Sequence, residues 1–424
     1  MRWKVNRLQA VRAFFRWDNP YFWAVLFRVG LLALMRPHPR GDAGDFQVIA
    51  HNLAAGHGFS RCWVPPFPPT SQRPPLYPFI LSILYTFEIS DVYGPGILNM
   101  VFDLLAMKTS EKLGRAMGLS RPQVFPWVLA LCPMLITMGN YPLTESLSVL
   151  LFFLASLYFF EGRTARSGFT FGLLALCRSY YLLFPALLAV LNTVWRPIRK
   201  IPTKALILGV VLSLAAPSVW VTRNLITLKR PLFSQTGTAG QQAYYGLCRL
   251  GFDWWDPEDL QHVMSTRPFK EIISGQCLTD DQLLSLNTEA WQKVSECVQI
   301  RPGETAINVL AKTWSLFFEW GQIFPYDYVP KGPRTIIDII MMLIWVRMIW
   351  IWSSYLRRNP LDASLRYVLV NIGYVLLITL PFGIDARYLL APGMLAFGVT
   401  LQLLPRPMDF VQEPLLRIFG NSES

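Results

Sequence analysis

Apolar stretches long enough to cross a lipid bilayer recur along nearly the whole chain, and they constrain the fold more than any other feature. Of the 424 residues, 53% are apolar and only 16% are charged, against roughly a quarter charged in an average soluble protein. A helix crosses the hydrocarbon core with about 20 apolar residues. The sequence therefore predicts an all-α polytopic membrane protein with about 10–11 transmembrane helices, because helices satisfy their own backbone hydrogen bonds in lipid.

The basic residues lie mostly in short connections between apolar stretches, where the positive-inside rule accounts for them. The net charge of +12 therefore indicates topology, and we expect no nucleic-acid partner. A basic N-terminus places that end of the chain in the cytoplasm, with Arg2, Lys4, Arg7, Arg12 and Arg16. No small-residue cleavage site follows the first apolar stretch, residues 21–35, so we interpret it as a retained membrane anchor.

Further crossings are expected at residues 97–117, 124–138, 145–160, 205–221, 336–355, 365–382 and 388–404. Residues 168–195 have basic clusters at both ends, which favours a hairpin of two short helices broken near Arg178. Residues 75–87 are too short to span comfortably, and residues 305–324 are expected to be interfacial or re-entrant, with spanning left open.

Three regions follow from these boundaries. Residues 1–222 would form an N-terminal catalytic transmembrane module, in which residues 36–78 are the first extracytoplasmic loop. Residues 223–304 would form an extracytoplasmic segment, and residues 305–424 the C-terminal transmembrane segments. The expected location is a bacterial inner (plasma) membrane, with the active site on the extracytoplasmic side.

The first loop begins with two carboxylates, Asp42 and Asp45, and continues as a short amphipathic helix. Its apolar residues follow helical spacing, at Phe46, Ile49, Ala50 and Leu53, so that His51 and Asn52 are expected to face away from them. A helix of this kind, too short to span, lies at a membrane surface. The two carboxylates would then stand at the edge of the lipid phase.

The same topology gathers ionisable groups on or near the extracytoplasmic side, namely Asp42, Asp45, Arg73, Glu145, Arg178, Arg223 and Arg387. Such groups at membrane depth are costly and usually face a cavity or a partner. A carboxylate can take a proton from an incoming hydroxyl, and guanidinium groups can hold a phosphate through two hydrogen bonds. The set is therefore suited to chemistry on a lipid-linked phosphate.

Each group also has a simpler interpretation. Asp42, Asp45 and Glu145 stand where a helix begins, and an acid there stabilises the helix. Arg73, Arg223 and Arg387 could extend from span ends toward the membrane surface. Arg178, in the middle of an apolar block, needs a partner in either case. His51 and His57 lack metal-ligand spacing with Cys or other His residues, so no zinc site is expected.

The six cysteines divide by compartment. Cys132 and Cys177 lie in membrane segments and are expected to be buried apolar residues. The other four, Cys62, Cys248, Cys277 and Cys297, are extracytoplasmic in this topology and could form up to two disulfides, with three pairings open.

Together these residues resemble a GT-C superfamily membrane glycosyltransferase of the polyprenyl-phosphate-sugar-dependent branch, which contains protein O-mannosyltransferases and lipid A aminoarabinose transferases (glycosyltransferase family 39). The first loop carries the family pattern as Asp42, Phe46, Ala50, Asn52-Leu53, Gly56-His57-Gly58 and Arg73-Pro74-Pro75-Leu76-Tyr77-Pro78. Later matches are Pro142, Thr144 and Glu145, then Ala175 to Arg178, Trp220 to Asn224, and Arg387-Tyr388-Leu389. Two departures are Ala43, where members with an acidic pair have Glu, and Phe46 in place of the commoner Tyr.

The resemblance implies a GT-C fold and an inverting glycosyltransferase that moves a monosaccharide from a polyprenyl-phosphate donor to an acceptor hydroxyl. Asp42 would be the catalytic base, with Asp45 sharing the role. The implied substrate-binding residues are Arg73, Tyr77, Glu145, Arg178, Arg223, Arg387 and Tyr388. Glu145 would orient either the acceptor or a divalent cation, the one candidate cofactor. The partners would be the lipid-linked sugar, membrane lipid and an acceptor that is a glycan, a lipid or a protein.

Two other functions fit a polytopic chain with arginines in a cavity. A transporter or flippase of lipid-linked sugars often shows paired halves with interrupted helices, and the sequence contains no such repeat. A GT-C-like oligosaccharide ligase would use a diphosphate-linked donor and is not distinguished by sequence. The sugar, the acceptor, metal dependence and the oligomeric state are also left open.

Overall fold

The computed structural model of the chain describes residues 17–35, 39, 41–194, 198–233, 239–248, 268, 277–318, 331–359, 362–379 and 386–404. The regular secondary structure of these residues is helical, with no β-strand; a single isolated bridge joins Ser60 and Pro69. The all-α prediction is therefore confirmed for the part of the chain that the structure describes.

Most helices coincide with the apolar stretches of the sequence. They are α2 (Pro20–Met35), α3 (Asp42–Ala54), α4 (Leu76–Thr86), α5 (Gly94–Ala116), α6 (Val124–Ala130), α7 (Pro133–Met138), α8 (Glu145–Phe160), α9 (Thr164–Ala175), η1 (Ser179–Tyr181), α10 (Phe184–Val194), α11 (Thr203–Leu228), α12 (Ala239–Leu247), α15 (Asp280–Ile300), α16 (Pro302–Phe318), α17 (Lys331–Arg358), α18 (Ala363–Thr379), η3 (Ala386–Leu389) and α19 (Leu390–Leu403).

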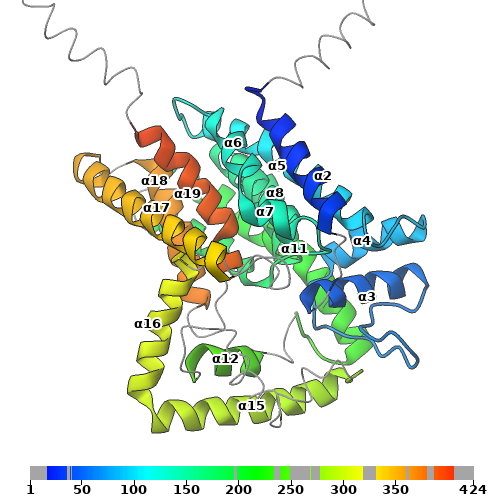
Figure 1. Cartoon of the computed structure of the whole chain (residues 1–424). Helices are drawn as coiled ribbons and strands as arrows, with labels where there is room; N and C mark the ends of the chain where they lie inside the picture. The colour runs from blue at the N-terminus through cyan, green and yellow to red at the C-terminus, as the bar shows by residue number, and fades with distance from the viewer. Residues whose placement is uncertain are drawn as a thin grey trace, which may run out of the picture.

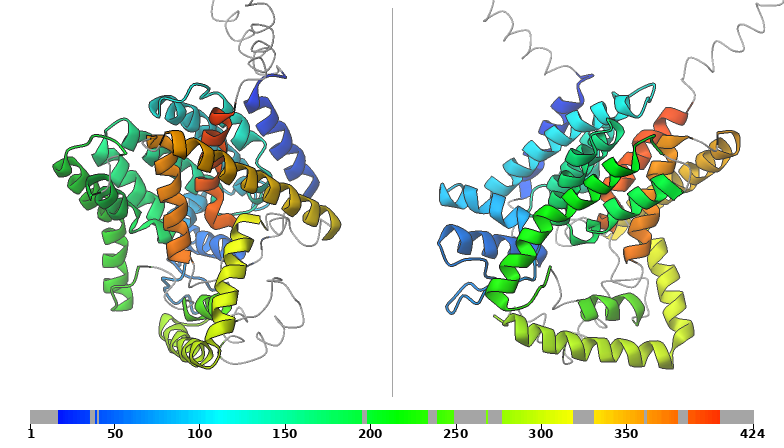
Figure 2. Two further views of the ribbon diagram at one scale, coloured as in Figure 1. Left: turned by 90° about the vertical axis from the view of Figure 1, so that its left-hand side faces the viewer. Right: turned by 180° about the vertical axis from the view of Figure 1, so that it is seen from behind.

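The long apolar helices form one bundle, and the polar segment lies at one end of it (Figure 1). Helices α12 and α15 occupy that end, and α16 leads from α15 back toward the bundle (Figure 1). The beginning of α2 and the end of α19 lie at the opposite end, as the turned views also show (Figure 2). One hydrophobic core runs through the bundle from α2 to α19, and the division at residues 222 and 304 stays a prediction.

Residues 124–138, expected as one crossing, instead form α6 and α7 with a break at Leu131 and Cys132. Pro133 causes the break because it lacks the N–H that would bond to the carbonyl of Leu129. The guanidinium of Arg28 replaces that donor and bonds to the carbonyls of Leu129 and Ala130 at 3.3 and 3.4 Å. Its Nε lies 2.7 Å from Asp103, so the buried charge is paired.

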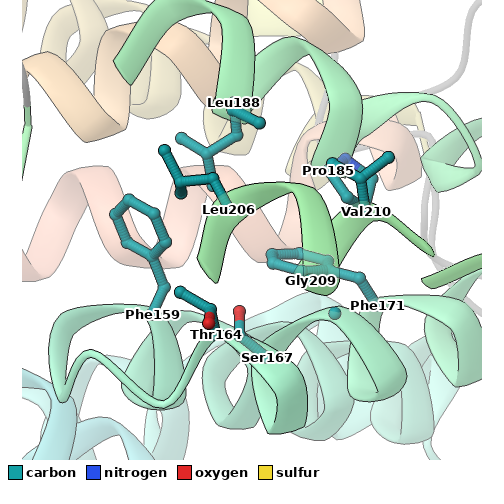
Figure 3. Close-up of a pocket in the computed structure, with 11 residues that line it drawn as sticks. Phe159, Thr164, Ser167, Phe171, Pro185, Leu188, Leu206, Gly209 and Val210 are labelled. Atoms are coloured by element: carbon teal, nitrogen blue, oxygen red, sulfur yellow. The ribbon is translucent and has the colours of Figure 1, made fainter. Parts of the chain in front are cut away.

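The predicted break near Arg178 is confirmed, since α9 ends at Ala175 and the chain resumes with η1 and α10. Phe171 of α9 packs against Phe184 of α10, with ring centroids 5.2 Å apart. Thr164 at the start of α9 and Leu188 of α10 line one apolar pocket (Figure 3). The two helices therefore run back along each other as a hairpin.

The pocket of Figure 3 lies far from the carboxylates of the first loop. Its lining includes Phe159, near the end of α8. Glu145 begins the same helix, and 1.5 Å per residue separates the two positions by about 21 Å along the axis. The chemistry expected of the charged residues of the first loop and of Glu145 cannot therefore take place in this pocket.

Helices α9 and α11 approach each other closely at four small residues, two on each helix. A Cβ on Gly168 would lie 1.9 Å from the carbonyl oxygen of Gly209, and one on Gly172 would lie 2.6 Å from that of Ser213. Small residues at such a crossing let two backbones approach, as they do in membrane helix pairs. The spacing of Gly168 and Gly172 therefore sets how α9, and with it Arg178, is placed.

Two described helices are each long and apolar enough to cross a bilayer. They are Thr203–Leu228, with a mean hydropathy of 2.0, and Asp338–Arg358, with a mean hydropathy of 1.7. The shorter apolar helices have 10–17 residues, among them Pro20–Leu34, Glu145–Phe160 and Ala363–Thr379. Membrane association is supported by these two helices, and a multi-pass topology is part of the proposal below.

Replacing Gly168 by Ala is expected to destabilise the protein, because the added methyl group meets the backbone of α11. Overpacking of this kind costs roughly 1–3 kcal/mol. Gly373 of α18 is the matched control, since a Cβ there has no atom within 4 Å, and Ala favours a helix over Gly by about 1 kcal/mol. Thermal unfolding in detergent should show a lower midpoint for Gly168→Ala only; equal midpoints for both variants would contradict this packing.

Candidate functional site

The first loop folds back on α3 because polar side chains and two glycines fasten it. Gly56 and Gly58 have positive φ angles of 78° and 83°, which turn the chain after α3. Asn52 is buried, and its amide donates to the carbonyls of Ser60 and Cys62 at 2.9 and 2.8 Å. Asn52, which was expected to face away from the apolar residues of α3, is thus covered by the returning loop, and helical spacing does not reveal such a loop.

Arg73, at the end of this loop, joins the two carboxylates of α3. Its Nη2 lies 2.6 Å from Asp42 Oδ1 and 2.6 Å from Asp45 Oδ2. Asp45 also accepts from Arg61 Nε at 2.6 Å, and Arg61 donates to Gln72 Oε1 at 2.7 Å. The N-cap residue of α3 is Gly41, which makes no side-chain capping bond, and the two aspartates bind arginines of the loop.

Glu145, the first residue of α8, is the acid of a second cluster. Its Oε1 lies 2.5 Å from Arg178 Nη2, at the break after α9, and 3.5 Å from Arg387 Nη1 in η3. The Glu145 side chain is only 1% exposed. Both of its carboxylate oxygens and Arg178 Nε lack a hydrogen bond of good geometry, so the charges meet while hydrogen-bonding capacity stays unused.

Arg387 connects the two clusters, because its Nη2 lies 3.7 Å from Asp42 Oδ2. The result is an alternating chain of charges, which we call the ion network: Arg61, Asp45, Arg73, Asp42, Arg387, Glu145 and Arg178. Among the described residues of this network, four guanidinium groups stand beside three carboxylates. Guanidinium groups attract an anion that comes near them.

The exposed fractions identify the open side of the network. The Asp42 side chain is 40% exposed, against 13% for Asp45 and 1% for Glu145. Asp42 is thus the carboxylate that a substrate can reach. Asp45 lies between Arg61 and Arg73 and is suited to holding them in place.

Arg73 lowers the pKa of Asp42 to about 2, below its ordinary value of 3.8, and Arg387 acts in the same direction. Burial alone would lower the pKa of Arg73, but the two aspartates raise it above its ordinary value. Both groups are therefore fully charged at neutral pH. In this arrangement Asp42 is ionised but weakly basic, because its negative charge is stabilised by arginines.

Of the expected site residues, the structure brings together Asp42, Asp45, Arg73, Glu145, Arg178 and Arg387. Arg223 has other partners: it donates to the carbonyl of Thr70 at 3.0 Å and stacks on Trp220. Tyr77 is buried and donates to Asn99 at 3.2 Å. Tyr388, next to Arg387, packs edge-on against Tyr180 with centroids 5.3 Å apart.

The site does not fit a divalent cation. Glu145, the residue suggested for that role, faces two guanidinium groups that would repel a second cation. Among the described residues, no group of three or more His, Cys, Asp or Glu side chains is arranged to hold a metal. The ion network instead presents arginines, which are ligands for phosphate or carboxylate.

Two disulfides form among the four cysteines that were expected to be extracytoplasmic, in one of the three pairings that the sequence left open. Cys62 of the first loop pairs with Cys277, and Cys248 pairs with Cys297 of α15. Cys132 and Cys177 are free and buried, as expected. The expected acidic, Trp-rich part of the outer segment, at residues 253–259, lies outside the described residues.

Several residues that support the first loop and the bundle were missed from sequence, namely Arg61, Gln72, Asn99 and Asp103. Arg61 directly precedes Cys62, so its position beside a disulfide-forming cysteine was the available signal. Asp103 and Arg28 could have been paired as two charges within apolar stretches. No motif or charge pattern in the sequence indicated Gln72 or Asn99.

Comparisons with known proteins add no further assignment. No protein-family model matches the chain, and neither a characterised relative nor a solved structure matches it. The function must therefore be argued from the site.

Proposed function

We propose that this chain is an inverting membrane glycosyltransferase of the GT-C type, which transfers a monosaccharide from a polyprenyl-phosphate donor to an acceptor hydroxyl. The observation that carries the proposal is the ion network, in which a reachable carboxylate, Asp42, stands between two arginines, Arg73 and Arg387. A base and a phosphate site are needed side by side in such a reaction. The ordered motifs of the first loop support the same family.

In the proposed reaction the donor phosphate binds Arg73, Arg387 and Arg178. Arginines that hold the phosphate no longer neutralise Asp42, so its pKa rises from about 2 toward its ordinary value and the carboxylate becomes a better base. Donor binding would thus activate the base. The unused hydrogen-bonding capacity of Arg178 Nε and Glu145 is suited to a phosphate oxygen and a sugar or acceptor hydroxyl, respectively.

Asp42 then takes the proton of the acceptor hydroxyl as its oxygen attacks the anomeric carbon. The bond from this carbon to the phosphate oxygen breaks, and the electron pair stays on the phosphate. Attack from the face opposite the leaving group inverts the anomeric configuration. The arginines stabilise the second negative charge that develops on the phosphate, so the leaving group needs no proton.

A multi-pass membrane location is supported by apolar side chains on the outside of the bundle. Helix α17 exposes Ile336, Leu343 and Trp350, and α11 exposes Ile207, Val211 and Val219. Contiguous apolar surfaces of this kind are unusual on soluble proteins and ordinary against lipid. The polar helices α12 and α15 lie at the end of the bundle opposite to the start of α2 (Figure 1), which fits an extracytoplasmic site and a cytoplasmic N-terminus.

Transporters often bind their substrate at interrupted helices, but the two helix breaks of this chain give little support to a transporter. The carbonyls freed at the break between α6 and α7 bind Arg28 and are not available to a substrate. The break after α9 supplies Arg178, which faces Glu145 in the ion network.

Asp42→Asn is expected to lower transfer by about 10²–10⁴-fold, the usual effect of removing a general base. The purified chain would be given a panel of radiolabelled polyprenyl-phosphate monosaccharides, with a membrane extract as the source of acceptors. Asp91→Asn is the matched control, because Asp91 is half exposed and pairs with His51 outside the network. The native chain and Asp91→Asn should consume the same donor. Consumption of no donor by the native chain, or full activity in Asp42→Asn, would contradict the proposal.

Ser90 and Ser120 allow a test of topology, because both are exposed and they flank the 23-residue helix α5. At 1.5 Å per residue α5 is about 35 Å long, enough to separate the two sides of a bilayer. A membrane-impermeant maleimide should label Ser90→Cys in intact cells and Ser120→Cys only after permeabilisation. The reverse pattern, or equal labelling, would contradict an extracytoplasmic site; the native chain controls for labelling of other cysteines.

A further inference from the structure

Asp280, the first residue of α15, contacts the first loop 209–210 positions earlier in the chain. Its Oδ1 accepts from Thr70 Oγ1 at 2.9 Å, and its Oδ2 accepts from Ser71 N and Ser71 Oγ at 3.0 and 2.7 Å. Hydrogen bonds to a charged acceptor are stronger than neutral ones. One carboxylate of the outer segment, that of Asp280, therefore holds residues 70 and 71 of the loop.

The residues that Asp280 holds lie shortly before Arg73 in the sequence. Gln72 follows Ser71 and accepts from Arg61, and Arg73 comes next and binds Asp42 and Asp45. Thr70, Ser71 and Gln72 are 1–6% exposed. A displacement of Ser71 would therefore be transmitted along the backbone to Arg73.

Two further contacts fix the same loop from other directions. Arg223 of α11 donates to the carbonyl of Thr70 at 3.0 Å. The disulfide between Cys62 and Cys277 ties the loop to the chain three residues before Asp280. With α15 held covalently, loss of the Asp280 carboxylate would change local hydrogen bonds and leave the outer segment attached.

We propose that Asp280 is a positioning residue for Arg73, so that the outer segment holds the phosphate-binding arginine from outside the bundle. This proposal rests on the function proposed above, in which Arg73 binds the donor phosphate. Asp280 touches neither phosphate nor sugar and acts only through residues 70–73. It therefore influences donor binding more than the chemical step.

The neighbouring acid supplies a matched control. Asp281 is 77% exposed and pairs with Arg230 at 2.9 Å, outside residues 70–73. Both acids begin α15, whose N-terminus is capped by Thr279 and Gln282. Asp280→Asn and Asp281→Asn therefore remove equal charge from the same helix end, and only Asp280→Asn places an amide against the N–H of Ser71.

The test is chemical modification of arginine by phenylglyoxal in the full-length chain, followed residue by residue with mass spectrometry. Asp280→Asn should increase the modification rate of Arg73 several-fold, because Arg73 leaves its two aspartates more often, and Asp281→Asn should leave the rate unchanged. In transfer assays Asp280→Asn should raise the KM for the donor about tenfold, as expected for one lost charge-assisted hydrogen bond, with kcat changed little. Asp280→Glu, which keeps the carboxylate, should recover part of the loss.

An unchanged Arg73 modification rate in Asp280→Asn, or the same increase in Asp281→Asn, would overturn the proposal. So would a fall in kcat with an unchanged donor KM, because that would assign Asp280 to the chemical step or to general stability. If the native chain transfers no sugar at all, the proposed function fails, and the arginine modification still decides whether Asp280 positions Arg73.

Discussion

The structure depends on the pairing of partly buried arginines with carboxylates at one end of a helical bundle. Arg73, Arg387 and Arg178 come from a loop, a 3₁₀ turn and a helix break, and Asp42 and Glu145 begin two helices. Leaving one of these charges unpaired would cost folding free energy. The five segments therefore meet so that each arginine lies beside a carboxylate. The same pairing leaves the arginines charged and close together. They can then exchange a carboxylate for another anion at little further cost in desolvation.

Contacts that fix the backbone surround the ion network. Asn52 and the Cys62–Cys277 disulfide fasten the loop to α3 and to the outer segment, and Asp280 holds the residues before Arg73. Close packing of α9 on α11 at Gly168 fixes the helix whose end carries Arg178. The network therefore combines side chains that can change partners with a backbone that is held in place, as preorganised electrostatic stabilisation requires.

Helix positions were predictable because long apolar stretches carry a strong signal, and α8 begins and ends where the sequence placed it. The break at Pro133 was missed, although proline removes a helix hydrogen bond, because hydropathy does not register it. Within the site, the sequence indicated six residues that the structure brings together, five of them in the family motifs and Asp45 as the second carboxylate of the first loop. Arg61 and Asp280 were not found, because their roles depend on contacts of 16 and about 210 residues in sequence separation, which periodicity does not encode.

The most direct test of the central claim is a binding measurement that separates the phosphate from its lipid. The native chain would be titrated with a short-chain polyprenyl phosphate and with the polyprenol of equal length, and the unfolding temperature followed. A ligand that binds the folded state stabilises it by mass action. The account predicts that the phosphate raises the unfolding temperature of the native chain, that the alcohol does not, and that Arg73→Gln loses most of the effect. Equal stabilisation by the two lipids, or full stabilisation in Arg73→Gln, would contradict an arginine site for a lipid phosphate.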